Sequence, residues 1–577
     1  MNGSLTGRFY RRAVAQGLIG SVAAIYLALI GIIERFEPRN VVTGVVTLGR
    51  VAPALIVLVL VYRAARPPRA WGMAEPSRTQ RVAASVLAGV ASGIGVGLFL
   101  VLNHLVDMSG VLVGATPGME QLLSFELEFP AGPLAIAATG LAIGAAAAGL
   151  HLVTPQVRRP LVAAFGSVLL LSLMETFMRV VLLQLGQDDL AAFFYKSGGL
   201  TAPAAVVVFA IVLAIGLANA YRGEAVRDRV KALPPDRRRS MQIVVFVIGL
   251  VILVALPQLI GSFLSEVIGT VGIFILMGLG LNIVVGYAGL LDLGYVAFFA
   301  IGAYTTALLT SPASALGIGM SFWLALPIVV VVGAVAGLMI GAPVLRLRGD
   351  YLAIVTLGLG EIVRILLLSV ALSPWTGGSQ GILQVPPPAL LDIDFFRPQN
   401  LYYPILAFVL IGVFVAYTLA HSRIGRAWNA MREDEDVAAA TGINITNYKL
   451  LAFSLGAVFG AIAGTFLAVK LGSIFPHRLD VLVSITVLSL IILGGMGSIP
   501  GVIVGAFVLV GLPELLREFA EYRLLIYGLV LMGMMLWRPE GLIPSAQRRR
   551  ELRDDLEDDI QSPDRPPAEQ SAPAMQS

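Results

Sequence analysis

Long apolar runs follow one another along almost the whole chain. A bilayer core is crossed by about 20 apolar residues in a helix, and runs of that length form two sets. About six lie near 14–33, 41–61, 82–102, 133–153, 161–183 and 201–220. About ten more lie near 241–260, 266–285, 288–310, 322–343, 351–370, 402–420, 450–471, 481–496, 500–517 and 523–537. The pattern predicts an all-α polytopic membrane protein with about sixteen transmembrane helices, although the closely spaced last three runs could include a re-entrant segment.

The stretch Gly280–Leu309 indicates what kind of helices these are. Its only charged residue is Asp292, and small residues occur on almost every turn. Glycines in a membrane helix let neighbouring helices approach closely. We therefore predict a tightly packed helix of the kind that builds a transport pathway, with close approaches at Gly280, Gly286, Gly289, Gly294 and Gly302.

Arginines gather on every second loop, which fixes a predicted orientation because basic residues favour the cytoplasmic side. The N-terminus, the 63–81 loop, Arg158–Arg159, the 222–239 stretch, Arg346/Arg348, 423–432 and 548–550 share one side. Loops 103–132 and 371–401 share the other side and are rich in Asp, Glu or Pro. Both termini are therefore predicted to be cytoplasmic.

Changes in amino-acid composition along the sequence predict that the chain has four parts. Residues 1–220 form an N-terminal transmembrane extension, and 221–240 form a basic cytoplasmic linker with a Pro-Pro break. Residues 241–545 form a second membrane domain, and 546–577 form a charged, Pro-rich tail with too little apolar surface to fold.

Composition narrows the possible functions. Hydrophobic residues make up 57% of the 577 residues, charged residues make up 13%, and the mean hydropathy is +0.86, as in integral membrane proteins. There are no cysteines, and the four histidines lack metal-ligand spacing, so we expect neither disulfides nor a metal site. The sequence has no G-x-x-x-x-G-K-[ST] motif, so the chain cannot hydrolyse ATP by that route. We expect neither an enzyme nor a nucleic-acid binder.

The segment 425–447 is too polar to span a membrane and lies on the predicted cytoplasmic side. We predict a short helix from Ala427 to Ala440, ended by a left-handed Gly442. A solvated loop and a docking surface are both compatible with this composition. If the segment is a docking surface, the residues that we expect to take part are Gly425, Arg432, Glu433, Asp434, Ala438, Ala439 and Gly442.

Six sequence blocks, in order, resemble the LivM-type permeases of branched-chain amino-acid ATP-binding-cassette importers. They begin at Leu281 (LNIVVGYAGLLDLGYVAFF), Leu347 (LRGDYLAIVTLGLGEIVRILL), Thr376 (TGGSQGI), Gly425 (GRAWNAMREDEDVAAATGINITNYK), Leu493 (LGGMGSIPGVIVGAF) and Trp537 (WRPEGLIP). They cover residues 241–545, whereas residues 1–240 match nothing in that family's core.

The resemblance implies partners and a role for the polar segment. Segment 425–447 would be the coupling helix that docks on an ATPase subunit. The expected partners are two ATPase subunits that hold the ATP, a LivH-type second permease and an extracytoplasmic solute-binding protein, in a bacterial-type plasma membrane. Transported solutes would be branched-chain amino acids or related small polar molecules such as urea and amides. This chain itself would need no cofactor.

Polar residues in or near the spans are candidates for the translocation path, because burying them in hydrocarbon is costly. Each has a structural alternative. Asn282 could bond another helix, Asp292 could cap or pack, and Glu361 could pair with Arg364. Thr376 and Ser379 belong either to a plain turn or to an outward lip that accepts solute, and LGGMGSIPG to a tight turn or a hinge.

A second functional hypothesis is a stand-alone secondary transporter or channel. It predicts ion ligands in broken helices and two matching halves. The 280–309 motif has no repeat in the first 240 residues. The extension could also act as a scaffold.

Overall fold

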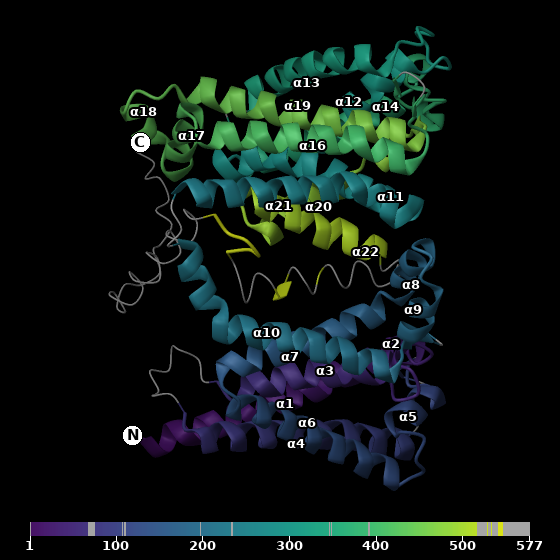
Figure 1. Ribbon diagram of the computed structural model, residues 1–577, viewed down its shortest axis with the longest axis vertical. Helices are drawn as coiled ribbons and strands as arrows, with labels where there is room; N and C mark the ends of the chain where they lie inside the picture. Colours follow the sequence, from purple (N-terminus) through teal and green to yellow (C-terminus); the bar gives the residue numbers. More distant parts are fainter. Residues whose placement is uncertain are drawn as a thin grey trace, which may run out of the picture. The chain divides into compact units, whose positions relative to one another are not determined.

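The computed structural model in Figure 1 describes residues 2–66, 76–106, 108, 111–112, 114–196, 198–231, 235–344, 347, 349–390, 393–515, 528, 532–533 and 540–545. The chain forms two compact units, Met1–Ile248 and Gly249–Ser577. Within the described ranges, eleven helices are long and apolar enough to cross a membrane. The chain is therefore an all-α, multi-pass membrane protein.

The first unit contains ten helices and four short strands among its described residues. They are α1 (Asn2–Leu29), α2 (Ile32–Phe36), β1 (Asn40–Val42), β2 (Val46–Thr47), α3 (Leu48–Ala64), α4 (Arg78–Val106), α5 (Pro117–Leu123), α6 (Ala131–Leu152), α7 (Pro155–Leu173), α8 (Glu175–Gln184), α9 (Asp188–Phe194), β3 (Tyr195–Lys196), β4 (Gly199–Leu200) and α10 (Ala202–Lys231).

Small residues set the packing of this unit. Helices α1, α4 and α6 lie side by side (Figure 1), and α4 crosses α6 where Gly89 and Gly93 face Gly140. A side chain at any of these glycines would overlap the opposite backbone, so only glycine permits this crossing. The strands form one sheet in the order β2-β1-β4-β3, in which β1 and β4 are parallel.

The second unit begins within α11 (Pro235–Leu281). It continues with a π-helix η3 (Asn282–Tyr287), α12 (Val296–Thr310), α13 (Phe322–Val344), α14 (Asp350–Leu368), α15 (Ser373–Thr376), a 3-10 helix η4 (Gly378–Gln380), β5 (Ile382–Leu383), β6 (Ala389–Leu390), β7 (Ile393–Asp394), α16 (Pro398–Ala420), α17 (Arg423–Glu433), α18 (Glu435–Ala440), α19 (Ile445–Leu471), β8 (Ser473–Ile474), a 3-10 helix η5 (Pro476–Arg478), α20 (Val481–Gly494), α21 (Ile499–Ala506), a π-helix η6 (Phe507–Gly511) and α22 (Leu512–Leu515).

Helix α19 is central to the second unit and runs beside α13 and α16 (Figure 1). It crosses α12 where Gly302 and Gly464 leave no room for side chains. Around this crossing, Tyr295, Phe298 and Phe453 form a buried aromatic cluster. The five predicted close approaches along 280–309 are confirmed, because a side chain at each of those glycines would overlap a neighbour.

The predicted helix through Gly280–Leu309 is wrong in one respect. It breaks at residues 288–295, between the π-helix η3 and α12, so α12 is only 15 residues long. Side chains from distant helices satisfy the freed backbone groups. The Leu293 N–H donates to the Thr356 hydroxyl at 3.0 Å, and the Val296 N–H donates to the Ser484 hydroxyl at 2.9 Å. Irregular backbone at membrane depth requires such partners.

The eleven candidate spans among the described residues account for twelve of the sixteen predicted spans, because 241–260 and 266–285 share α11, which bends at Gly261. Spans 41–61, 288–310 and 500–517 fall on shorter helices, and 161–183 is divided between α7 and α8 at Met174. The prediction for 523–537 lies almost wholly outside the described residues. The count of sixteen and the cytoplasmic termini stay predictions.

Candidate functional site

The polar segment 425–447 folds as two helices, not as the predicted single helix from Ala427 to Ala440. Asp434 separates them with an extended backbone (φ −156°, ψ 116°). Its Oδ1 accepts hydrogen bonds from the N–H groups of Asp436 (2.8 Å) and Val437 (3.0 Å). An aspartate favours this capping geometry over a helix interior. The break therefore follows from Asp434 itself.

Gly442 ends α18 in the left-handed conformation that the sequence predicts, with φ +91°. The Gly442 N–H donates to the Ala439 carbonyl at 3.0 Å, and the Ile443 N–H donates to the Ala438 carbonyl at 3.2 Å. This pair of bonds is the Schellman motif, which glycine adopts without steric cost. No atom lies within 4 Å of where a Gly442 side chain would begin, so this turn faces outward.

One face of the polar segment is anchored in its own unit. Trp428 is fully buried, and its Nε1–H donates to the Tyr448 carbonyl at 2.9 Å. Gly425 is buried where a side chain would overlap the backbone of Leu419 and Ala420. Two candidate docking residues, Gly425 and Ala438, are thus packing positions.

The other face is exposed and combines small with acidic residues. Its small and acidic exposed residues are Glu433, Asp434, Asp436, Val437, Ala439, Ala440 and Gly442, and the segment also exposes Arg426, Thr441, Asn444, Thr446 and Asn447. Val437 is an apolar side chain that is 60% exposed. The Lys449 ammonium forms an ion pair with Glu435 of α18 at 2.6 Å, although the Lys449 side chain is only 5% exposed. This lysine, which fixes α18 on α19, was missing from the predicted candidates.

Arg432 joins the polar segment to the broken helix. Its Nη1 donates a hydrogen bond to the Gly286 carbonyl at 2.7 Å. Gly286 lies in the last turn of η3, where helix carbonyls lack intrahelical donors. Gly289, just beyond η3, lies against the same arginine, since a methyl group there would fall 2.9 Å from Arg432 Cγ.

Asn282 joins the broken helix to a third element. It is buried in η3, and its Oδ1 accepts a hydrogen bond from the Gly497 N–H at 2.8 Å. Gly497 belongs to the LGGMGSIPG turn between α20 and α21. We call the five residues Asn282, Gly286, Gly289, Arg432 and Gly497 the junction. They bring together three of the sequence blocks that carry the family resemblance.

Asp292 lies in the break after the junction and is 1% exposed. Its Oδ1 accepts a hydrogen bond from the Gly294 N–H at 2.9 Å, so Asp292 stabilises the turn within the break. It does not cap α12, because the N-cap of that helix is Tyr295 and has no side-chain bond. Among the described residues, its Oδ2 has no hydrogen-bond partner. A buried carboxylate oxygen without a partner is costly, so this position is a candidate functional group.

The remaining path candidates lie apart from the junction. Glu361 and Arg364 form a two-bond ion pair on α14 with side chains 36% and 26% exposed. The Thr376 hydroxyl is buried and accepts from the Gly378 N–H, so Thr376 stabilises its own turn. Ser379 is exposed in the same turn. The turn precedes β5, which pairs with β8.

Metal binding has no support in the part of the chain that the structure describes, where no group of three His, Asp or Glu side chains could hold an ion.

Known proteins match the second unit. The family described as "Branched-chain amino acid transport system / permease component" matches residues 263–536. The high-affinity branched-chain amino acid transport system permease protein LivM of Salmonella typhimurium is 42% identical over 327 residues, which cover 53% of this chain and 75% of the relative. LivM of Escherichia coli is 42% identical over 332 residues, covering 53% and 76%. No solved structure matches the chain.

A weaker match is the permease protein LivH of Escherichia coli, 33% identical over 141 residues that cover 24% of this chain and 44% of the relative. The names of these relatives describe permease proteins of a transport system and not enzymes. The high identity over three quarters of LivM confirms the resemblance predicted from the motifs. This chain belongs to the LivM-type family of branched-chain amino-acid transport permeases.

Proposed function

We propose that this chain is a transmembrane subunit of an ATP-binding-cassette importer in a bacterial-type plasma membrane. It would translocate branched-chain amino acids or related small polar solutes. The observation that carries the proposal is the junction, in which Arg432 links an outward-facing polar segment to a broken helix. Family membership supports the solute class, because the relatives are named for branched-chain amino acid transport.

The polar segment has the properties of a coupling element. The exposed Val437, Ala439 and Gly442 offer a small, partly apolar surface that a partner can approach closely. The buried Trp428 and the Lys449–Glu435 ion pair hold that surface rigidly. A displacement imposed by an ATPase subunit would therefore reach Arg432 without being lost in the loop.

Two hydrogen bonds, those of Arg432 and Asn282, would transmit that displacement into the membrane domain. Moving Arg432 shifts the Gly286 carbonyl at the end of η3, and Asn282 carries the shift to the α20–α21 turn. π-helical turns occur frequently at functional sites within longer helices. In this mechanism the break at 288–295 is the hinge between α11 and α12, and ATP is bound only by the two ATPase partners.

The opposite side of the unit would meet the other partners. The loop between α14 and α16 exposes Trp375 (52%) and Phe396 (79%) together with Ser379. Large exposed apolar patches mark interaction surfaces, and these two aromatic side chains are among the exposed apolar groups of the loop. We assign this loop to docking of the extracytoplasmic solute-binding protein. A LivH-type permease would complete the pathway.

Reconstitution tests this proposal. The full chain is placed in proteoliposomes with its ATPase subunits, second permease and solute-binding protein, and uptake of labelled leucine is measured. We expect uptake only with ATP and with every partner present. A competing function is a stand-alone ion-coupled transporter, which the unpartnered Oδ2 of buried Asp292 favours. Leucine uptake by this chain alone, driven by a proton or sodium gradient, would establish that alternative instead.

A further inference from the structure

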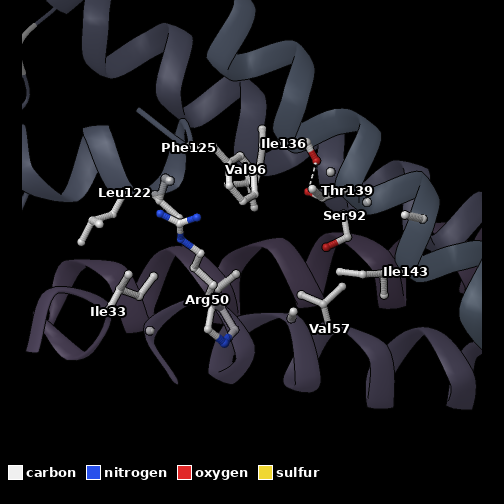
Figure 2. Close-up of a pocket in the computed structure, with 18 residues that line it drawn as sticks. Ile33, Arg50, Val57, Ser92, Val96, Leu122, Phe125, Ile136, Thr139 and Ile143 are labelled. Atoms are coloured by element: carbon white, nitrogen blue, oxygen red, sulfur yellow. Dashed lines mark hydrogen bonds between the residues drawn. The ribbon is translucent and has the colours of Figure 1, made fainter. Parts of the chain in front are cut away.

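The extension contains a partly open pocket of about 340 Å³ (Figure 2). It lies between α3, α4 and α6, with α5 at one end. Ligand pockets range from about 300 to 1,000 Å³, so this one has room for a single narrow ligand. The space exists because small residues and a proline line much of it, among them Gly49, Pro53, Ala54, Gly93 and Gly140.

The pocket wall is almost entirely apolar. Of the polar side chains in the wall, Thr139 is already satisfied, because its hydroxyl donates to the Ile136 carbonyl at 2.7 Å. The Ser92 hydroxyl is turned toward the cavity in Figure 2. Since α4 and α6 are candidate membrane spans, the acyl chains of lipids would surround them, and these chains are the apolar molecules nearest to this pocket.

Both signs of charge occur at the α5 end of the pocket. Arg50 Nε forms an ion pair with Glu37 at 3.2 Å, and Arg50 Nη2 lies 3.7 Å from Glu126. Glu37 is held further by the Thr47 hydroxyl at 2.8 Å. Glu126 is 73% exposed, and among the described residues its carboxylate is held by this long contact alone. Glu37 therefore fixes the Nε side of Arg50, whereas the Nη2 side and the Glu126 carboxylate, joined only by a long contact, can turn to a ligand.

At the α5 end of the pocket, a strained backbone positions the side chains of Phe125 and Glu126. Phe125 and Glu126 both have left-handed conformations, with φ 58° and 62°. Bulky residues rarely adopt such angles, whereas glycine does so freely. Strain of this kind persists mainly where function requires the side chain. Here it presents the Phe125 ring to the pocket and the Glu126 carboxylate to Arg50.

From the pocket, the paired charges and the strained turn, we propose a lipid site in the extension. The pocket binds one acyl chain of a membrane phospholipid with a primary-amine headgroup, of the phosphatidylethanolamine class. Arg50 binds the phosphate and Glu126 accepts hydrogen bonds from the ammonium group. The proposal concerns the extension alone and does not depend on the transport function.

Native mass spectrometry of the full-length chain tests the site. The chain is delipidated in detergent and offered phosphatidylethanolamine, phosphatidylcholine or phosphatidylglycerol separately. We expect one retained phosphatidylethanolamine, and weaker retention of the other two, because a choline cannot donate hydrogen bonds and a glycerol carries no positive charge. Equal retention of all three lipids would overturn the headgroup assignment.

Two variants locate the site. Ala54→Leu fills the pocket, so the bound lipid should be lost, whereas Ala145→Leu on an exposed face of α6 outside the pocket should keep it. Glu126→Gln should remove the preference for phosphatidylethanolamine over phosphatidylglycerol while a lipid stays bound. Retention by Ala54→Leu equal to that of the unaltered chain would overturn the proposal.

A measurement on the unaltered chain does not depend on how the variants fold. A phosphatidylethanolamine with a photoactivatable group on one acyl chain should label the α3 and α6 residues that line the pocket. Labelling that spreads over the exposed faces of the extension without enrichment at these residues would count against the site.

Discussion

Arg432 of α17 forms a hydrogen bond that positions the end of η3, a helix far from it in sequence. A guanidinium offers five fixed N–H donors and stays charged, and one of them bonds the Gly286 carbonyl at 2.7 Å. A charge-assisted hydrogen bond contributes about 1.5–3 kcal/mol. The last turn of η3 therefore takes its position from α17, although the two are 146 residues apart in sequence.

We expect Arg432→Ala to uncouple transport. The variant should insert and assemble, and its partners should still hydrolyse ATP, but uptake should fall roughly 10–100-fold if the lost bond is worth 1.5–3 kcal/mol. Uptake and ATP hydrolysis are measured in the same proteoliposomes. Arg423→Ala is the control, because it removes the same charge from the exposed start of α17. Uptake by Arg432→Ala at the unaltered rate would exclude a coupling role.

A second residue-scale prediction concerns Gly442. Its φ of +91° suits glycine and is strained for a β-branched residue by about 1–3 kcal/mol. Gly442→Val should therefore disorder the end of α18, leave membrane insertion intact and separate ATP hydrolysis from uptake. Gly442→Asn is the matched variant, since asparagine tolerates the left-handed conformation and should retain coupling. Coupled uptake by both variants would mean that this turn does not contact an ATPase.

Residues differ in how far the sequence alone could place them. The conformation of Gly442 was predictable because it depends on neighbours in sequence. The targets of Arg432 and Asn282 were not predictable, because a carbonyl 146 residues away and an amide 215 residues away leave no local pattern. Lys449 was missed because its partner Glu435 lies on a separate helix.

At the scale of elements, apolar run length predicted where helices lie better than where they break. The runs containing α13, α16 and α19 were located to within a few residues. The break at 288–295 lies in a stretch whose only charged residue is Asp292, and the hydroxyls of Thr356 and Ser484 that stabilise it come from other helices. Length and hydropathy carry no information about such partners, so the runs 266–285 and 288–310 were placed almost end to end and the irregular segment 288–295 was missed.

The crossing of α4 and α6 yields an element-scale prediction. A side chain at Gly140 would overlap the backbone of Gly89 and Gly93. Gly140→Val should therefore force the helices apart and destabilise the extension by about 1–3 kcal/mol, as overpacked cores do. Gly149→Val on the same helix is the control, since nothing lies within 4 Å of that position.

Thermal unfolding and limited proteolysis of the full chain check this prediction. The Gly140→Val protein should be cleaved within residues 1–248 at a lower temperature than the Gly149→Val protein. Equal resistance of the two variants would show that the α4–α6 crossing does not limit the stability of the extension.

At the scale of the whole molecule, the two units have separate hydrophobic cores. The largest buried cluster runs from Val271 to Leu509 and contains no residue of the first unit. The first unit has its own clusters, for example the one around Phe9, Val61 and Ala147. The matches to LivM proteins and to the family occupy about half of the chain. The sequence blocks could thus assign the second unit but not the extension, which has no motif tied to known chemistry.

Independent cores predict that the second unit folds without the extension. A domain with its own core can in principle fold alone, so a chain of residues 241–577 should insert, assemble with its ATPase partners and support ATP-driven uptake. It should also lose the retained phosphatidylethanolamine, because every residue lining the pocket lies in residues 24–143. Uptake and native mass spectrometry on the same preparation separate the two units' roles. If the truncated chain inserts and pulls down its ATPases but does not transport, the extension takes part in the transport cycle. If the truncated chain fails to insert, the core of the second unit is not independent of the extension.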